Sequence, residues 1–148
     1  GRLDALVRQH IAPGFARPAL AHNQLNGMLK GYMDLVLEQG GRYYVVDYKS
    51  NWLGVDSTAY TRDAMQAAVL QHRYEVQYVL YTYALHRLLQ QRLPHYDYGR
   101  DVGGVLYWFL RGVDAPSQGM YTDKPPIALM DALDALFAPS ASLASERL

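Results

Sequence analysis

The sequence predicts an α/β fold in which helices flank a mixed β-sheet. Three observations indicate this class. Two short runs rich in Tyr, Val and Leu lie on either side of Gly40-Gly41, a long helical pattern follows them, and a nearly all-apolar run from Val105 precedes a final amphipathic segment. An order of strand, strand, helix, helix, strand and helix is typical of an α/β sandwich with a mixed sheet.

A β-hairpin is predicted for residues 31–49. Its strands are 31–37 and 43–49, because β-branched and aromatic runs on either side of a glycine pair are typical of a hairpin. Upstream, Leu3 and Leu6 hint at a helical turn, and the prolines that follow them break the pattern.

The middle of the chain is predicted to be helical from about Thr58 to Arg92. Asp56-Ser57 can cap this segment, apolar residues recur along it at helical spacing, and Pro94 stops it. A break around residues 72–73 would give two helices or one bent helix.

The last third of the chain is predicted to contain a strand over Val105–Leu110, whose apolar character indicates burial on both faces. A short strand is expected near Met120-Tyr121. Pro125-Pro126 precedes a helix over Ile127–Phe137 with one apolar face. Residues 139–148, rich in Ser and Ala, are expected to form a flexible tail.

The composition is that of one compact domain over residues 1–148. Half of the residues are hydrophobic and 19% are charged, which suits a packed core and excludes a disordered tail. No apolar run approaches the ~20 residues that cross a bilayer, and the start lacks a signal-peptide pattern. Because the chain begins at Gly1 without Met, we expect it to be a piece of something larger.

The cysteine count and the charge exclude further classes. The absence of cysteine excludes disulfides, a thiolate nucleophile, cysteine zinc sites and iron–sulfur clusters, and is compatible with a cytoplasmic location. The 14 basic and 14 acidic side chains balance, which argues mildly against a freestanding nucleic-acid binder. A partner or a neighbouring domain could supply the missing attraction for phosphates.

Three ionisable residues are predicted to converge on one patch of the hairpin. Strand alternation places Asp47 and Lys49 on the same face, at the point where an apolar run turns polar. Because the turn centres between Gly40 and Gly41, Asp34 falls opposite Asp47. Each residue taken alone has an ordinary explanation, a surface ion pair for Asp47 and Lys49 and an edge charge for Asp34.

The convergence favours a catalytic metal site. Two carboxylates beside one ammonium leave net negative charge, which a proton or a cation must compensate. Mg²⁺ and Mn²⁺ suit such a site, because they bind one or two carboxylates together with water and substrate phosphate. Lys49 could then orient the attacking water and stabilise the charge that develops on the phosphoryl oxygens.

The helical segment adds candidates for contact with DNA. Gln77 and Tyr81 stack on one helix face, so Gln77 could hold a phosphate or Lys49 while Tyr81 packs behind it; the alternative is that Tyr81 is a core residue. His72 and Arg73 are candidates for phosphate contact. Most of the thirteen tyrosines, Tyr48 among them, alternate as strand core residues do.

Three strings of residues are recognisable together: Gly31–Val36, Asp47–Gly54 and Gln77-x-x-x-Tyr81. With them the chain resembles the PD-(D/E)xK nuclease superfamily and, more narrowly, the C-terminal nuclease domains of the RecB family, over about residues 25–137. Further matching strings are His72-Arg73-Tyr74, Gly103–Tyr107 and Phe109–Gly112.

The resemblance implies a restriction-endonuclease-like fold with its N-terminal part truncated, and a Mg²⁺-dependent exodeoxyribonuclease in which Mn²⁺ can substitute. Asp34, Asp47 and the backbone carbonyl of Tyr48 would bind the metal, Lys49 would serve the attacking water, and Gln77 would help to place the strand. The implied partners are single- or double-stranded DNA and the RecC and RecD subunits of a helicase–nuclease in double-strand-break repair and recombination, in the bacterial cytoplasm.

One departure from that family concerns the residues before Asp34. The family also uses a Glu and a His from upstream helices, whereas this chain offers Asp4 as its one acid there, and His10 and His22 lie in no matching motif. We expect those helices to be missing and the chain alone to be inactive or feeble. The alternative is a non-catalytic DNA-guiding or subunit-docking module with an incomplete site. Relatives with an iron–sulfur cluster are excluded, because they need four cysteines.

Overall fold

The computed structural model describes residues 1–30 and 35–138. Its strands are β1 (Leu35–Gln39), β2 (Arg42–Lys49), β3 (Val102–Phe109) and β4 (Met120–Asp123), which lie in this order across one sheet. Its helices are α1 (Arg2–His10), α2 (His22–Lys30), α3 (Arg62–Gln71), α4 (Tyr74–Arg92), α5 (Tyr98–Asp101) and α6 (Ile127–Phe137), with 3₁₀ turns at Ser57–Ala59 and Leu110–Gly112.

The sheet is mixed, as predicted. β1 pairs with β2 antiparallel, β2 with β3 parallel, and β3 with β4 antiparallel. The parallel pair needs a long crossover, which α3 and α4 supply between β2 and β3. This crossover brings α4 across the end of β2, where the polar residues lie.

The hairpin turn has the predicted geometry. Gly40 and Gly41 have φ angles of 61° and 79°, the left-handed values that a two-residue type I′ turn needs at both positions. The five described pairs, from Gln39 with Arg42 to Leu35 with Val46, follow the expected register. Asp34 and the predicted tail at 139–148 lie outside the described residues.

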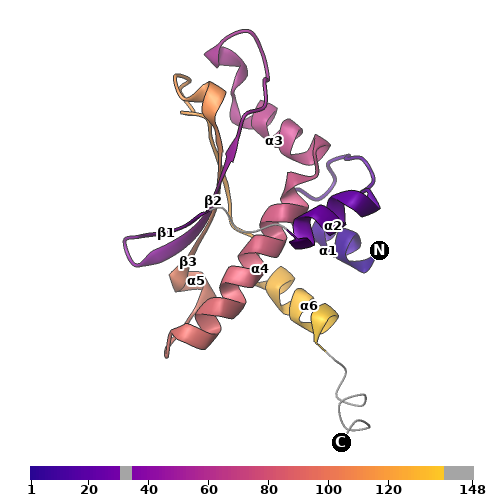
Figure 1. The fold of residues 1–148 in the computed structure, drawn as a ribbon, viewed down its shortest axis with the longest axis vertical. Coiled ribbons are helices and arrows are strands. Elements are labelled where there is room, and N and C mark those ends of the chain that lie inside the picture. The colour runs from indigo at the N-terminus through magenta and orange to yellow at the C-terminus, as the bar shows by residue number, and fades with distance from the viewer. Residues whose placement is uncertain (31–34, 139–148) are drawn as a thin grey trace, which may run out of the picture.

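Helices cover one face of the sheet. Figure 1 shows α4 lying across this face with α3 above it, and α1 and α6 pack against the far side of α4. The buried core joins these layers through Val7 of α1, Met65 and Val69 of α3, Val76, Val79 and Leu85 of α4, Val45, Val105, Tyr107 and Phe109 of the sheet, and Leu129, Met130 and Leu133 of α6.

The expectation that β3 is buried on both faces was wrong. Tyr107 and Phe109 face the helices and are fully buried, whereas Leu106 and Trp108, which alternate with them, are only partly buried. Leu110 follows the strand and is exposed. An all-apolar run cannot show which face the helices cover, because that depends on the path of the crossover.

The helical segment begins later than predicted. Asp56 caps a 3₁₀ turn by accepting from the Thr58 backbone N–H, and Thr61 caps α3 through the Ala64 N–H. The expected break is confirmed, because Arg73 adopts a left-handed conformation with φ of 57° between α3 and α4. α4 ends at Arg92 and α6 covers 127–137, both as predicted.

The first thirty residues contain two helices, where the sequence hinted at a single helical turn. Across residues 1–30 and 35–138, none of the helices combines the length and the apolar character that a bilayer crossing requires.

A buried histidine on α4 makes the stability of the fold depend on pH. His86 is almost fully buried, and its Nδ1 lies 2.6 Å from the Tyr96 hydroxyl oxygen. Burial lowers the pKa of His86 below its usual 6.5, against the opposing charges of Asp131 and Asp134. The unfolded chain therefore binds a proton more readily than the folded one, so stability is lost as pH falls below 6.5.

We expect the free energy of unfolding to decrease between pH 7 and pH 5, with a His86 contribution of at most about 1.4 kcal/mol per pH unit. Urea titrations at several pH values measure it. His86→Gln should flatten the profile, while the exposed matched control His95→Gln should leave it unchanged. Parallel profiles for the wild type and His86→Gln would contradict this role of His86.

Candidate active site

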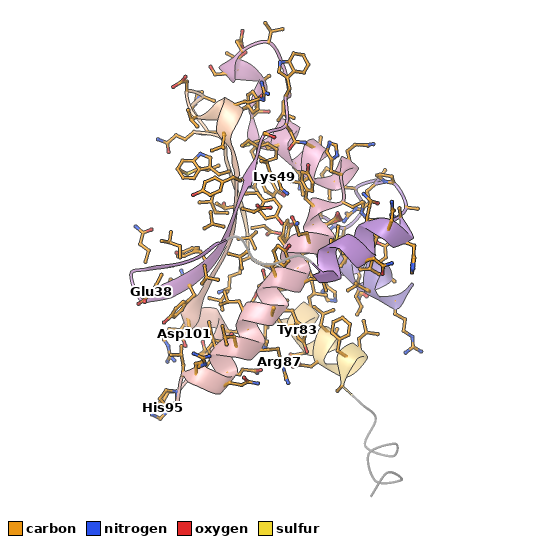
Figure 2. The ribbon with its side chains drawn as sticks, viewed as in Figure 1. Glu38, Lys49, Tyr83, Arg87, His95 and Asp101 are labelled. Atoms are coloured by element: carbon orange, nitrogen blue, oxygen red, sulfur yellow. The ribbon has the colours of Figure 1, made fainter. Side chains whose placement is uncertain are left out.

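An acid and an amine meet at the end of β2, on the face that the helices cover. The Lys49 Nζ lies 2.8 Å from the Asp47 Oδ2, and the two side chains are only 12% and 6% exposed. The pair is therefore not an exposed surface ion pair, which was the ordinary alternative for these two residues. Figure 2 shows Lys49 at the end of β2 on the side of the helices.

Gln77 from α4 fixes the position of the amine. Its amide Oε1 accepts hydrogen bonds from the Lys49 Nζ at 3.2 Å and from the Tyr107 hydroxyl at 2.6 Å. Its Nε2 donates to the Tyr81 hydroxyl at 3.4 Å. With donors on its oxygen and an acceptor by its nitrogen, the amide has one consistent orientation, with its oxygen toward the lysine.

Two aromatic rings enclose the ammonium group. The Lys49 Nζ lies 3.8 Å from the centre of the Tyr74 ring and 4.9 Å from the centre of the Tyr107 ring, within the range of cation–π attraction. The Asn51 Nδ2 donates to the Tyr74 hydroxyl at 3.2 Å. The amine is thus held by one carboxylate, one amide and two aromatic rings.

The Tyr107 ring packs against a second tyrosine, Tyr78. The Tyr78 ring meets it edge-on, with centroids 5.5 Å apart and planes at 84°. Burial, reinforced by the charge of Asp123, raises the pKa of Tyr78, so its hydroxyl stays protonated and donates to the Asp123 Oδ2 at 2.7 Å. The site therefore rests on buried groups whose rotamers are fixed by packing.

Sequence reasoning missed Tyr74, Tyr107 and Asn51. Tyr74 precedes Gln77 by three residues, which is helical spacing for one face and could have indicated it. Tyr107 pairs across the sheet with Asp47. That register joins strands separated by the whole α3–α4 crossover, and no local pattern reveals it.

The three residues predicted to contact DNA differ in exposure: one is accessible to solvent and two are buried. His72 is exposed and stacks on Tyr74, with centroids 5.1 Å apart and planes at 16°, so it lies beside the site. Tyr81 is buried behind Gln77, where the functional interpretation placed it, and it also belongs to the hydrophobic core, as the alternative predicted. Arg73 is fully buried in ion pairs with Asp4 and Glu75, which corrects the expectation that it contacts DNA.

Tyr48 differs from the strand core residue that the alternation predicted. Its side chain points away from the helices and is 48% exposed, and its ring stacks on Trp108 at a centroid distance of 6.1 Å. The Tyr48 ring is therefore partly in contact with solvent.

Two oxygen donors of the predicted metal site lie at the end of β2. The Asp47 carboxylate and the Tyr48 backbone carbonyl are hard oxygen donors of the kind that Mg²⁺ prefers. Residues 1–30 and 35–138 contain no group of three His, Cys, Asp or Glu side chains placed to hold a metal ion. Asp4 does not supply the upstream acid, because its carboxylate pairs with Arg8 and Arg73.

The sequence of the chain matches that of a known family, and the match agrees with the geometry of the site. The sequence model of the PD-(D/E)XK nuclease superfamily matches residues 3–143. The chain therefore belongs to this superfamily, as its motif predicted, and its mixed sheet with flanking helices is consistent with the restriction-endonuclease-like fold.

Among the proteins similar in sequence to this chain are RecB subunits. The RecBCD enzyme subunit RecB of Escherichia coli strain K12 is 53% identical over 139 residues, 93% of this chain. The corresponding subunits of Haemophilus influenzae and of Buchnera aphidicola from Acyrthosiphon pisum are 47% and 37% identical, over 80% and 86% of the chain. The chain spans only 10–12% of the length of these three relatives.

Proposed function

We propose that this chain is the nuclease domain of a RecB-type helicase–nuclease and that it hydrolyses phosphodiester bonds in DNA as a Mg²⁺-dependent exodeoxyribonuclease. The observation that carries the proposal is the largely buried Asp47–Lys49 pair. Its amine is held in place by Gln77 and by two tyrosine rings. A surface ion pair would need no such enclosure. Membership of the superfamily and the similarity to RecB subunits support the same function.

Asp34, Asp47 and the carbonyl of Tyr48 are proposed to bind Mg²⁺, or Mn²⁺ in its place. Two observations support this assignment. Asp34 immediately precedes Leu35 in the sequence, and the pairing partner of Leu35 is Val46, which immediately precedes Asp47. The donors are also all oxygens. When bound, such an ion polarises a phosphoryl oxygen and lowers the pKa of a bound water.

Lys49 is proposed to orient the attacking water or to donate to a phosphoryl oxygen. An ammonium group has three N–H donors, and Asp47 and Gln77 accept two of them. The Tyr74 ring restrains the side chain without removing its charge. A fixed positive group in a largely buried site stabilises developing negative charge better than a mobile one in water, because little reorganisation is needed during the reaction.

Single- or double-stranded DNA is the proposed substrate. His72 is the predicted contact that remains accessible, and its exposed ring on Tyr74 could meet a phosphate or a base close to the amine. The whole protein is proposed to act with RecC and RecD subunits in the bacterial cytoplasm, in double-strand-break repair and recombination, by analogy with the RecB relatives.

A non-catalytic DNA-guiding or subunit-docking module remains the second candidate. The observation that favours it is that the sequence before Asp34 offers Asp4 as its one acid, and the Asp4 carboxylate is paired with Arg8 and Arg73. Metal binding separates the two candidates, because a guiding module has no need of a dication at Asp47.

Isothermal titration of Mn²⁺ tests the proposed site. We expect the wild type to bind the ion and Asp47→Asn to lower the affinity by at least about tenfold, since the variant loses a charged ligand. Asp134→Asn, which changes a carboxylate in a surface ion pair with Arg87, is the matched control and should bind like the wild type. Equal affinities for the wild type and Asp47→Asn would show that Asp47 is not a ligand.

A further inference from the structure

A second cluster of charges lies buried at the corner between α3 and α4. Four side chains form it, and we call it the corner cluster: Asp4, Arg17, Arg73 and Glu75. The Arg73 Nε lies 3.1 Å from the Glu75 Oε1, and the Arg17 Nη1 lies 3.0 Å from the Glu75 Oε2. Arg73 also pairs with Asp4 through its Nη2. These four side chains carry two charges of each sign, and Arg8 adds a positive charge at the edge of the cluster, 3.2 Å from the Asp4 carboxylate.

The cluster ties the N-terminal segment to the helical corner. Besides its ion pairs, Arg73 donates from Nη1 to the backbone carbonyl of Pro18 at 2.8 Å, and Arg17 donates to the carbonyl of Ile11 at 2.9 Å. Two residues of the corner, Arg73 and Glu75, are thus bound to residues 4–18, which lie far away in the sequence.

Arg73 occupies an unusual position for an arginine. It is fully buried, and its backbone adopts the left-handed conformation that non-glycine residues rarely take. Burial alone would lower the pKa of its guanidinium, but hydrogen bonds and charges from Asp4 and Glu75 outweigh this effect and raise it. A buried, charged side chain on a strained backbone persists only when its surroundings determine it strongly.

The corner carries the residues that hold the lysine of the active site. Tyr74 lies between Arg73 and Glu75, and its ring faces the Lys49 ammonium at 3.8 Å. Gln77 follows within the first turn of α4 and accepts from the same ammonium. Neighbouring residues of the corner therefore contact different parts of the protein. Arg73 and Glu75 bind the N-terminal segment, and the Tyr74 ring contacts the Lys49 ammonium.

We propose that Arg73 is a positioning residue for the nuclease, acting through the corner cluster to set the start of α4 so that Tyr74 and Gln77 hold Lys49. This inference rests on the proposed function of Lys49. Arg73 acts without touching DNA, which distinguishes this role from the phosphate contact that its sequence suggested. A displacement of reacting groups by about 1 Å can reduce a rate by about 100-fold, so a loosened corner has a measurable effect.

The test compares the kcat and KM of variants for a labelled single-stranded oligonucleotide, in the full-length protein with Mg²⁺, normalised to the folded fraction. Arg73→Gln and Asp4→Asn are expected to lower kcat about tenfold and about threefold, with KM changed less than twofold. Arg73→Lys, which keeps the charge, should recover part of the kcat. Arg87→Gln changes a 54% exposed arginine of the same helix and is the matched control.

The salt dependence of DNA binding separates positioning from direct contact. Loss of one phosphate contact to a single strand reduces the slope of log K against log salt by about 0.7. For Arg73→Gln we expect the wild-type slope. A raised KM with a reduced slope would overturn the proposal in favour of direct contact with DNA.

A combined variant tests whether the cluster acts through Tyr74 and Gln77. When Asp4→Asn is added to a protein that carries both Tyr74→Ala and Gln77→Ala, we expect less than a twofold further loss of kcat, because the groups to be positioned are already absent. Losses that multiply would show that the cluster acts independently of Tyr74 and Gln77 and would overturn the proposal. Asp4 is partly exposed, so Asp4→Asn decides the matter if Arg73→Gln does not fold.

The failure of this inference can be told from the failure of the proposed function. If the wild type does not cleave DNA, the proposed function is wrong and the inference falls with it. If Lys49→Met retains full activity, the proposed role of Lys49 is wrong, and the inference, which rests on that role, falls while the nuclease function stands. If Lys49→Met is inactive while folded Arg73→Gln and Asp4→Asn keep kcat within twofold of the wild type, the function stands and only the positioning role is refuted.

Discussion

Replacing Lys49 with methionine in the full-length protein is expected to lower kcat for DNA cleavage by about 10²–10⁴-fold while Mn²⁺ affinity stays equal or increases. Methionine keeps the apolar stem that packs beside Tyr74 but removes the charge and all three donors. Asp47 then loses its 2.8 Å ion pair and keeps its full charge for a metal ion. Single-turnover cleavage and Mn²⁺ titration measure the two effects separately.

Measuring both metal binding and cleavage in each variant is more informative than measuring the loss of cleavage alone. Asp47→Asn should lose both metal binding and cleavage, whereas Lys49→Met should lose cleavage only. Lys124→Met is the matched control, because Lys124 is another partly buried lysine that donates to backbone carbonyls, at Tyr98 and Gly99. It should cleave like the wild type. If Lys49→Met cleaved DNA within tenfold of the wild-type rate, Lys49 would have no role in the chemistry.

Replacing Glu75 with alanine is expected to cost about 3–5 kcal/mol of unfolding free energy. Glu75 is fully buried and accepts from both Arg17 and Arg73, so alanine would leave two buried guanidinium groups without this partner. Uncompensated buried charge is far more costly than a lost surface ion pair. Urea unfolding, followed by circular dichroism, measures the difference.

The exposed Glu38 on the hairpin provides the control for Glu75. Figure 2 shows Glu38 on β1, well away from the helical corner. We expect Glu38→Ala to change the unfolding free energy by less than about 0.5 kcal/mol, as surface substitutions usually do. A cost below 1 kcal/mol for Glu75→Ala would mean that the corner cluster contributes little to the fold.

Local patterns in the sequence predicted much of the fold. The hairpin and its register follow from alternation on either side of two glycines, and α6 follows from an apolar stripe after two prolines. The start of α3 was misplaced because Asp56 and Thr61 are both good caps, and only the path of the chain shows which one begins the helix. The partial exposure of one face of β3 was missed for a similar reason, since the helices that cover a strand come from elsewhere in the chain.

The sequence by itself determined that Asp47 and Lys49 share a face and that Gln77 and Tyr81 share another, because side-chain direction repeats every 2 residues in a strand and every 3.6 in a helix. Only the tertiary structure decided that these faces meet, that Tyr107 joins them, and that Arg73 turns inward. Those contacts depend on the α3–α4 crossover and on the docking of α1, which place residues distant in sequence within a few ångströms of one another.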